Sequence, residues 1–353
     1  LKTVPDESVM KKYLEKDHIL PIIEKHRKAL SWKYATIKRF ESEHIKLLSA
    51  QSYLVKYTIT IVTDSGETFT MVLRGNRISP EAASMWQYLY DQSLKSKIHI
   101  VPTPLEYFSD DNFMLYEELS GKTLRDYDDK FPHLKKITPD IAKQIAWVHS
   151  LPIISQIGTH TVDAEKEYWQ SVIDKINEHH PEKPEWINEA LSKIHDTIIS
   201  AMDAETFTLC HNDFQASNII YNESTGKVGI IDFGNSTLFT PSLDIATHLV
   251  HLSVMTTKHL TQDEIHQLQR QFLATYLEVA PQELAKRVQD ELPLYIARVA
   301  TDIIATTAVA LSHTQNPYRI LIPKILLPVV KEKTALLGKT NHTIEDLLIT
   351  LNK

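Results

Sequence analysis

The chain has 353 residues, of which 42% are hydrophobic and 24% charged, and this composition excludes a largely disordered or collagen-like protein. Its length exceeds what one hydrophobic core usually supports, so we expect two packed domains. The single cysteine, Cys210, excludes a disulfide framework and a cysteine-based zinc cluster, and the net charge of −7 argues against a nucleic-acid surface. No apolar run approaches the length of a membrane span, and the polar first residues predict no signal peptide, so we expect a cytoplasmic protein.

The charge is spread unevenly along the chain. Residues 1–121 contain 16 basic and 16 acidic side chains, whereas residues 122–353 contain 22 basic and 29 acidic ones. A solvated acidic surface explains this asymmetry, and so does an acidic cleft that attracts a cationic substrate. Asp290, Glu291 and Asp302 are the candidate carboxylates for such a cleft.

The first third of the chain mixes helix and strand patterns. The expected elements are two short amphipathic helices in residues 6–31 broken at Pro21, a hairpin of strands 53–62 and 68–73, a helix that Ser79 caps and Pro80 opens, and strands at 98–101 and 113–119. Together they predict a β-rich domain with few helices.

After Gly121 the pattern becomes mainly helical. The expected elements are a helix at 141–149, one or two long helices in 163–202, a strand–loop–strand unit at 207–232, and helices from 244 to 353. We therefore predict an α+β protein with a small β-rich lobe and a larger α-helical lobe. The expected domains are a helical extension at 1–44, a β-rich lobe at 45–121 and a helical lobe at 122–353.

One segment carries a chemical pattern. His211 and Asp213 are separated by one residue, Asn218 follows five residues after Asp213, and Asp232 begins an Asp-Phe-Gly triplet. A strand–turn–strand pattern between Asn218 and Asp232 predicts that these two residues lie at neighbouring strand ends. Phosphoryl transfer uses such a set: one carboxylate accepts the proton of a hydroxyl, while an amide and a second carboxylate hold Mg²⁺. Turn and cap roles would explain one aspartate well but the whole set poorly.

Two further pairs have structural interpretations. Arg298 and Asp302 lie four residues apart on an apolar segment, which predicts a helix-stabilising ion pair in preference to a substrate contact. His248 and His251 lack further ligands at metal-site spacing, so we expect core or surface histidines.

The strings CHNDFQASNIIYN and GIIDFG resemble the aminoglycoside phosphotransferase / choline kinase-like family. The resemblance implies a protein-kinase-like fold, with Asp213 as the catalytic base and Asn218 and Asp232 as metal ligands. It also implies that His211 supports the loop from inside, although a core histidine is the alternative. Asp244 matches a further aspartate of the family, which we interpret as a structural support or as a helix cap.

The resemblance extends upstream and covers roughly residues 45–320. It implies that Arg74, at the end of a strand, contacts the nucleotide phosphates and that Glu81 is its ion-pair partner. A surface arginine at a strand end is the structural alternative.

Two other segments are implied to bind the nucleotide. Backbone groups from Glu117 to Leu119 would meet the base. The loop that contains Ser49 and Gln51 would help to cover the phosphates, yet it lacks the glycine that favours close backbone approach.

The resulting hypothesis is a Mg²⁺-dependent phosphotransferase that moves the γ-phosphate of ATP or GTP to a hydroxyl of a small molecule. An amine-bearing acceptor, such as an aminoglycoside, choline or ethanolamine, fits the family and the acidic second half of the chain. A protein or lipid-linked acceptor is one alternative, and a catalytically silent nucleotide-binding module is another. The sequence leaves the acceptor, the choice between ATP and GTP, and the oligomeric state open.

Overall fold

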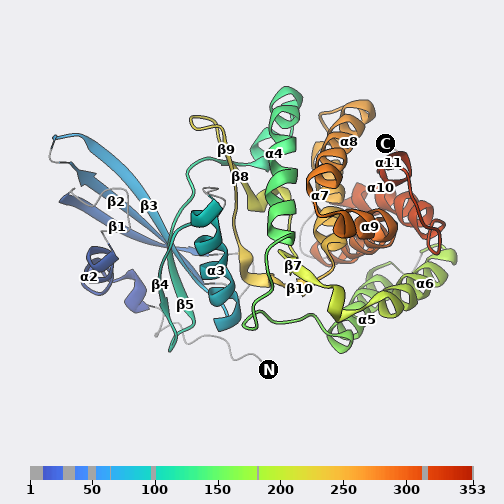
Figure 1. The fold of residues 1–353 in the computed structure, drawn as a ribbon, viewed down its shortest axis with the longest axis horizontal. Helices are drawn as coiled ribbons and strands as arrows, with labels where there is room; N and C mark the ends of the chain where they lie inside the picture. Colours follow the sequence, from blue (N-terminus) through green and yellow to red (C-terminus); the bar gives the residue numbers. More distant parts are fainter. Residues whose placement is uncertain are drawn as a thin grey trace. The chain divides into compact units, whose positions relative to one another are not determined.

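The computed structural model describes residues 11–26, 36–46, 53–63, 65–96, 101–180, 183–311 and 317–351. The chain divides into two compact units, one formed by residues 1–120 and 229–234 and the other by residues 121–228 and 235–353. An antiparallel sheet dominates the first unit and helices dominate the second (Figure 1). The predicted α+β class is therefore confirmed.

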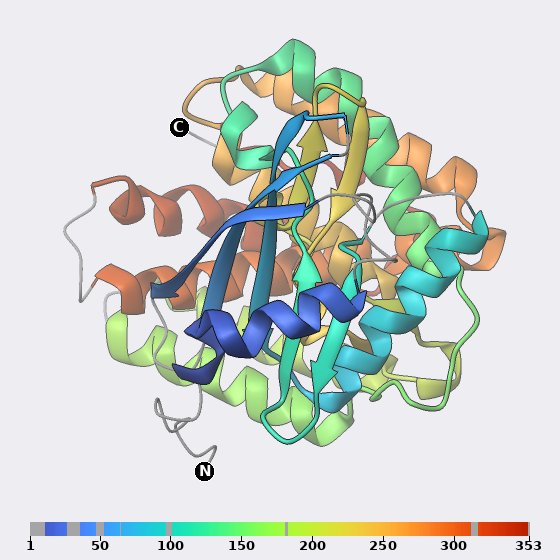
Figure 2. The same cartoon turned by 90° about the vertical axis from the view of Figure 1, so that its left-hand side faces the viewer.

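The first unit is built on a five-stranded antiparallel sheet with the strand order β1-β2-β3-β5-β4 (Figure 2). Its strands are β1 (Thr36–Lys46), β2 (Tyr53–Val62), β3 (Thr68–Arg77), β4 (Pro104–Phe108) and β5 (Phe113–Glu117). The predicted β2–β3 hairpin is confirmed. Strand β1 is absent from the predicted elements, and residues 36–44 correct the proposed helical extension at 1–44. Pairing with β2 satisfies the backbone hydrogen-bonding groups along one side of this edge strand.

The described N-terminal residues pack on this sheet. A single 3₁₀ turn, η1 (Lys12–Leu14), presents Tyr13, which is fully buried. The Tyr13 ring stacks on Phe113 with 3.8 Å between the ring centroids. The hydroxyl of Tyr57 donates to the Tyr13 backbone carbonyl at 2.7 Å. These residues therefore belong to the core of the first unit.

Helix α2 (Lys16–His26) follows η1 and contacts β1 and β4 (Figure 2). Pro21 lies inside this helix, so the predicted break at that residue is wrong. Proline removes one helical hydrogen bond. Burial of Ile19 and Ile23 against the sheet outweighs that loss.

Helix α3 (Pro80–Ser96) begins where the sequence predicts it. The Ser79 hydroxyl accepts the backbone N–H of Ala82 at 3.1 Å, which confirms Ser79 as the N-cap. The predicted strand at 98–101 falls largely on residues 97–100, which lie outside the described residues. The strand described next along the chain is β4.

The second unit consists mainly of helices. They are α4 (Phe131–His149), α5 (Val162–His179), α6 (Trp186–Ala201), α7 (Pro241–Thr256), α8 (Gln262–Val279), α9 (Gln282–Leu311), α10 (Pro317–Thr334) and α11 (Ile344–Leu347). Nearly every residue of α7 is buried, and this helix contacts α8, α9 and β7. A helix buried on all sides acts as the central support of its unit. None of the described helices combines the length and apolarity that a bilayer crossing requires.

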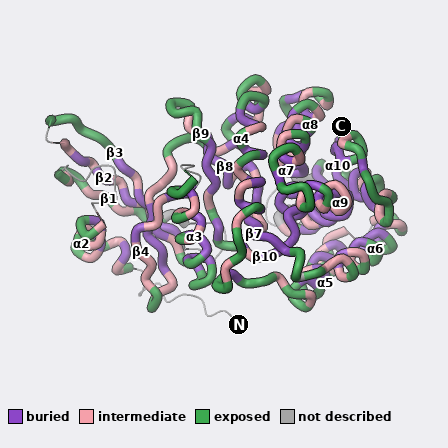
Figure 3. Tube along the Cα trace, in the orientation of Figure 1, coloured by how far each residue is buried: buried purple, intermediate pink, exposed green. Residues whose placement is uncertain are grey.

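Short strands flank the loops that carry Asp213 and Asp232. They are β6 (Lys122–Thr123), β7 (Thr208–Cys210), β8 (Ile219–Asn222), β9 (Lys227–Ile230) and β10 (Thr237–Phe239). Strands β6, β8 and β9 form one small sheet, and β7 pairs with β10 in another. Buried residues run along β7 and β8 (Figure 3). The loop between β7 and β8 is thus fixed at both ends by buried strands.

Candidate active site

The loop after β7 carries Asp213, whose carboxylate is held by two side-chain amides. Gln215 Nε2 donates to Asp213 Oδ1 at 2.8 Å, and Asn218 Nδ2 donates to Asp213 Oδ2 at 2.9 Å. Asn218 Nδ2 also donates to the backbone carbonyl of Asp213 at 2.9 Å. These bonds fix the carboxylate in one orientation, as a positioned base requires. They also orient the Asn218 amide, whose Oδ1 is the atom through which this residue would bind a cation.

Gln215 is a residue of this loop that sequence reasoning missed. Its backbone N–H donates to the carbonyl of Asp213 at 2.8 Å, in a tight turn that brings the two side chains together. The available signal was weak: a polar amide two residues after an aspartate. The two side chains come into contact only because the backbone forms a tight turn between Asp213 and Gln215.

Asp244, on α7, holds the backbone of the same loop. Its Oδ2 accepts the N–H of His211 and its Oδ1 accepts the N–H of Asn212, both at 2.7 Å. Thr240 caps α7 instead, because its hydroxyl accepts the N–H of Ser242. Of the two roles expected for Asp244, the geometry fits support of the loop.

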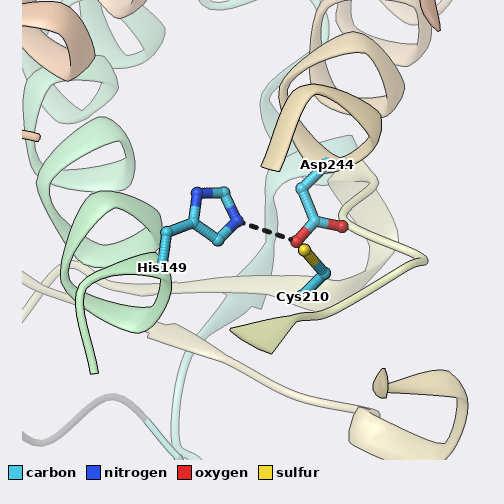
Figure 4. Close-up of side chains that lie close together, drawn as sticks. All are labelled: His149, Cys210 and Asp244. Atoms are coloured by element: carbon cyan, nitrogen blue, oxygen red, sulfur yellow. Dashed lines mark hydrogen bonds and ion pairs between the residues drawn. The ribbon is translucent and has the colours of Figure 1, made fainter. Parts of the chain in front are cut away.

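His149 and Tyr276 extend this support, and Figure 4 shows His149 beside Asp244 and Cys210. His149 Nε2 lies 3.1 Å from Asp244 Oδ2, and His149 Nδ1 lies 2.8 Å from the Tyr276 hydroxyl. With Cys210 alongside, ligand atoms of His149, Cys210 and Asp244 come within 4.8 Å of one another, the one such group in the described part of the chain. Hydrogen bonds already engage both Asp244 oxygens and both His149 nitrogens, and burial raises the pKa of the Cys210 thiol. We therefore assign this cluster to support of the loop and not to a metal.

Asp232 follows β9 and belongs to the first unit. Its φ is +65°, a conformation that aspartate tolerates and that is enriched at functional sites. The next residue, Phe233, is fully buried with its ring 6.3 Å from that of Trp86, which anchors the turn. Burial raises the pKa of Tyr116, Arg74 opposes this rise, and the charge of Asp232 adds to it. Asp232, Tyr116 and Arg74 thus share one electrostatic environment within the first unit.

Arg74, on β3, faces Tyr116 on β5 and forms its ion pair with Glu118, with 2.6 Å between Nε and Oε1. This pair replaces the predicted Arg74–Glu81 pair. Glu118 follows Tyr116 by two residues, so the strand register brings its side chain to the face that carries Arg74. Glu81 instead lies in the first turn of α3, where hydrogen bonds from its own N–H and from Ser79 lower its pKa.

The segment after β5 was predicted to meet the nucleotide base. The N–H groups of Glu117 and Glu118 donate to the carbonyls of Thr103 at 2.9 Å and Val72 at 3.0 Å. Burial raises the pKa of the Glu117 carboxyl. The N–H of Leu119 has no protein acceptor among the described residues. This backbone donor is therefore unused within the described part of the chain.

The predicted phosphate-covering loop, with Ser49 and Gln51, lies outside the described residues. The strands on either side of it, β1 and β2, are described, and Lys46 pairs with Tyr53 in their antiparallel register. The loop therefore joins two neighbouring strands of the sheet.

Arg298 forms a buried ion pair that the sequence did not predict. Its Nε and Nη2 donate to the two Glu165 oxygens at 2.8 and 3.0 Å, so the predicted Arg298–Asp302 pair is wrong. Burial would raise the pKa of Glu165, but Arg298 and His160 together lower it to about 2. A fully buried carboxylate needs such a partner, whereas Asp302 finds one in Tyr168.

Two other acidic residues proposed for a cationic cleft have structural partners. Asp290 contacts Lys286 Nζ at 3.0 Å and accepts the N–H of Asn341 at 3.0 Å. Glu291 pairs with Arg287 at 2.7 Å. These bonds favour a structural role for both carboxylates over contact with a substrate.

Of the two histidines of α7, His248 is confirmed as a core residue. His248 is buried, with its ring 4.4 Å from that of Phe272 and 5.3 Å from that of Phe214. Burial lowers the pKa of His248 to about 3 and that of His251 to about 4, so both stay neutral near pH 7.

Comparison with known proteins identifies the relatives of this chain. A family model described as the phosphotransferase enzyme family (APH) matches residues 56–287. Mouse ethanolamine kinase 1 is 32% identical over 97 residues, which span 28% of this chain and 24% of the mouse protein. The solved choline kinase of Cryptosporidium parvum aligns with a TM-score of 0.57 at 12% identity, over 92% of this chain and 96% of that one. Amicoumacin kinase hAmiN, in complex with AMP-PNP, Ca²⁺ and Ami, aligns with a TM-score of 0.55 at 13% identity, over 97% and 100% of the two chains. These likenesses confirm the predicted kinase-like fold.

Proposed function

The chain belongs to the phosphotransferase enzyme family, and we propose that it transfers the γ-phosphate of ATP or GTP to a hydroxyl of a small molecule. The observation that carries this proposal is the hydrogen bonding of the Asp213 carboxylate. Its two carboxylate oxygens are each held by an amide, and the loop behind it is fastened by Asp244. Such rigid positioning suits a group that accepts a proton in the transition state.

In the proposed reaction, Asp213 accepts the proton of the acceptor hydroxyl. The acceptor oxygen forms a bond to the γ-phosphorus while the bond between that phosphorus and the β–γ bridging oxygen breaks, which releases the nucleoside diphosphate. Asn218 Oδ1 and the Asp232 carboxylate would hold Mg²⁺, because hard cations of this kind prefer oxygen ligands. When bound, this ion neutralises charge on the phosphates.

The first unit would bind the nucleotide. Arg74 is proposed to contact the phosphates, and its exchangeable ion pair with Glu118 supports this role. The free N–H of Leu119 is proposed to meet the base, together with the backbone of Glu117. Ser49 and Gln51 remain predicted contacts to the phosphates.

An amine-bearing alcohol is the proposed acceptor class. Two of the relatives, an ethanolamine kinase and a choline kinase, support it, and so does the excess of acidic residues after residue 121. We place the reaction in the cytoplasm on the single cysteine and the composition.

A catalytically silent nucleotide-binding module is the second candidate, favoured by one observation: residues 47–52 contain no glycine. The presence of Asp213, Asn218 and Asp232 together speaks against it. A protein or lipid-linked acceptor remains the alternative within enzymes.

The decisive experiment is a phosphorylation screen of amino alcohols, sugars and aminoglycosides with ATP and with GTP, in Mg²⁺ and in EDTA. We expect Mg²⁺-dependent turnover of at least one amine-bearing alcohol, and none with Asp213→Asn. Nucleotide-dependent thermal stabilisation should survive in that variant. Stabilisation without turnover of any acceptor or of the nucleotide itself would favour the silent module, and absence of both would refute nucleotide binding altogether.

A further inference from the structure

Asn212, the residue before the candidate base, is fastened at both its backbone and its side chain. Its N–H donates to Asp244 Oδ1 at 2.7 Å. Its side-chain Nδ2 donates to the backbone carbonyl of Asn235 at 3.1 Å and to Thr237 Oγ1 at 2.7 Å. Its φ is +61°. No part of the proposed reaction uses this side chain.

The partners of the Asn212 amide lie on a different segment from the base. Asn235 and Thr237 follow Asp232, the candidate metal ligand, by three and five residues. Thr237 begins β10, where it pairs with Cys210 at the end of β7. The Asn212 amide therefore links the start of the loop that carries Asp213 to β10, the strand that follows Asp232.

A positive φ alone does not account for an asparagine at this position. Glycine adopts that conformation more readily, so a residue needed only for backbone shape would be replaceable by glycine. Asn341 offers a comparison within the same unit. Its φ is +59°, but among the described residues its side-chain amide meets only Thr340 Oγ1, at 3.4 Å. The difference lies in the two bonds that the Asn212 amide makes to another segment.

We propose that Asn212 is a positioning residue, whose side-chain amide couples the Asp213 loop to β10 and so holds the base in its reactive orientation. This inference rests on the proposed function. Loss of the amide frees the loop to rotate about the turn while the Asp244 bond to the backbone persists. Since orientation of the base matters in the transition state and not in nucleotide binding, the effect should fall on kcat and spare KM for the nucleotide.

The test compares Asn212→Gly, Thr237→Val and the double variant, with Asn341→Gly as the matched control. Each asparagine-to-glycine change keeps the positive φ and removes an amide, but only the first removes bonds between segments. We expect Asn212→Gly to lower kcat about 10- to 100-fold, in line with small misplacements of a reacting group. Thr237→Val should lower kcat roughly fivefold, the effect of one net hydrogen bond. The double variant should be no slower than Asn212→Gly, and Asn341→Gly should match the wild type.

The outcomes separate this inference from the proposed function. If the wild-type protein turns over and Asp213→Asn abolishes turnover, but Asn212→Gly keeps kcat within twofold, the coupling is refuted and the kinase assignment stands. Fully multiplicative effects of the two single variants would also refute the coupling, since independent residues behave in that way. If Asn212→Gly melts below the assay temperature, an unchanged kcat in Thr237→Val refutes it. A wild-type protein without any phosphotransfer or nucleotide hydrolysis refutes both.

Discussion

The Asp213 loop of the second unit and the surroundings of Arg74 in the first unit are held in different ways. Around Asp213, two side-chain amides engage the two carboxylate oxygens, and a fully buried Asp244 binds the backbone of the loop. Around Arg74, one ion pair to Glu118 dominates, and both side chains are 29% exposed. Partly exposed ion pairs contribute little free energy. The Asp213 carboxylate is thus oriented in advance, whereas the partly exposed Arg74–Glu118 pair can exchange. In the proposed function, a phosphate would take the place of Glu118 beside Arg74.

The largest expected effect is that of replacing Asp232, the proposed metal ligand after β9. Asp232→Ala should lower kcat by roughly 10³-fold or more, because loss of a metal ligand removes several kcal/mol of charge stabilisation. It should also uncouple nucleotide binding from Mg²⁺, which calorimetry with and without the ion would measure. Asp232→Asn, which tolerates the same positive φ, is the control for backbone strain. Unchanged Mg²⁺-dependent affinity in the alanine variant would remove Asp232 from the metal site.

The second prediction tests the prepared base. Asp213→Asn should lower kcat by at least about 10²-fold, the usual contribution of a positioned base, with little change in nucleotide affinity. Gln215→Ala removes one of the two amides that hold the carboxylate and should lower kcat by less, about fivefold. Steady-state kinetics on the best acceptor of the screen measures both. Wild-type rates in Asp213→Asn would contradict the assignment.

The third prediction tests the exchangeable partner of Arg74. Arg74→Ala should raise KM for the nucleotide about tenfold, the loss of a charge-assisted hydrogen bond to phosphate. Glu118→Gln releases the guanidinium and should leave that KM unchanged or slightly lower. Glu81→Gln should have no effect, because Glu81 is not the partner of Arg74 in the structure. A large rise in KM with Glu81→Gln would restore the partner predicted from the sequence.

The smallest effect concerns stability and pH. The pKa of buried His248 is lowered to about 3 from an ordinary value near 6.5, so between these values the unfolded chain binds a proton that the folded chain does not. Stability should therefore fall as the pH drops from 6.5 toward 3, by up to about 1.4 kcal/mol per pH unit from this residue. His248→Phe, between Phe214 and Phe272, should flatten the slope. Denaturant unfolding of both proteins at pH 7 and pH 5 measures it, and parallel slopes would contradict the prediction.

Local sequence patterns predicted much of this architecture correctly. The β2–β3 hairpin, the Ser79 cap of α3 and the helical second unit follow from alternation, turn residues and helical periodicity, which act over a few residues. The pattern failed at β1, because a charged edge strand carries little hydrophobic alternation, and its partner β2 decides its conformation. It failed again at Pro21, where burial of neighbouring side chains outweighs a local breaker.

The same division runs through the candidate site. The sequence by itself singled out the candidate residues, since Asp213, Asn218 and Asp232 stand at spacings that a short loop and hairpin require. Only the tertiary structure decided their partners. Glu118 takes the place of Glu81 beside Arg74, and Asp244 bonds to loop residues 32 and 33 positions earlier in the chain.

The range over which each interaction acts explains why local motifs were predictable from the sequence and distant partners were not. Turns and capping motifs bring together residues that are close in sequence, so their spacing can be read directly. An ion pair or a buried hydrogen bond between distant segments depends on strand register and helix packing, which are settled by burial of the whole core. Arg298 illustrates this point. Asp302 lies four positions along the same helix, yet Arg298 pairs with Glu165 on α5, because a fully buried carboxylate is unstable without a charged partner.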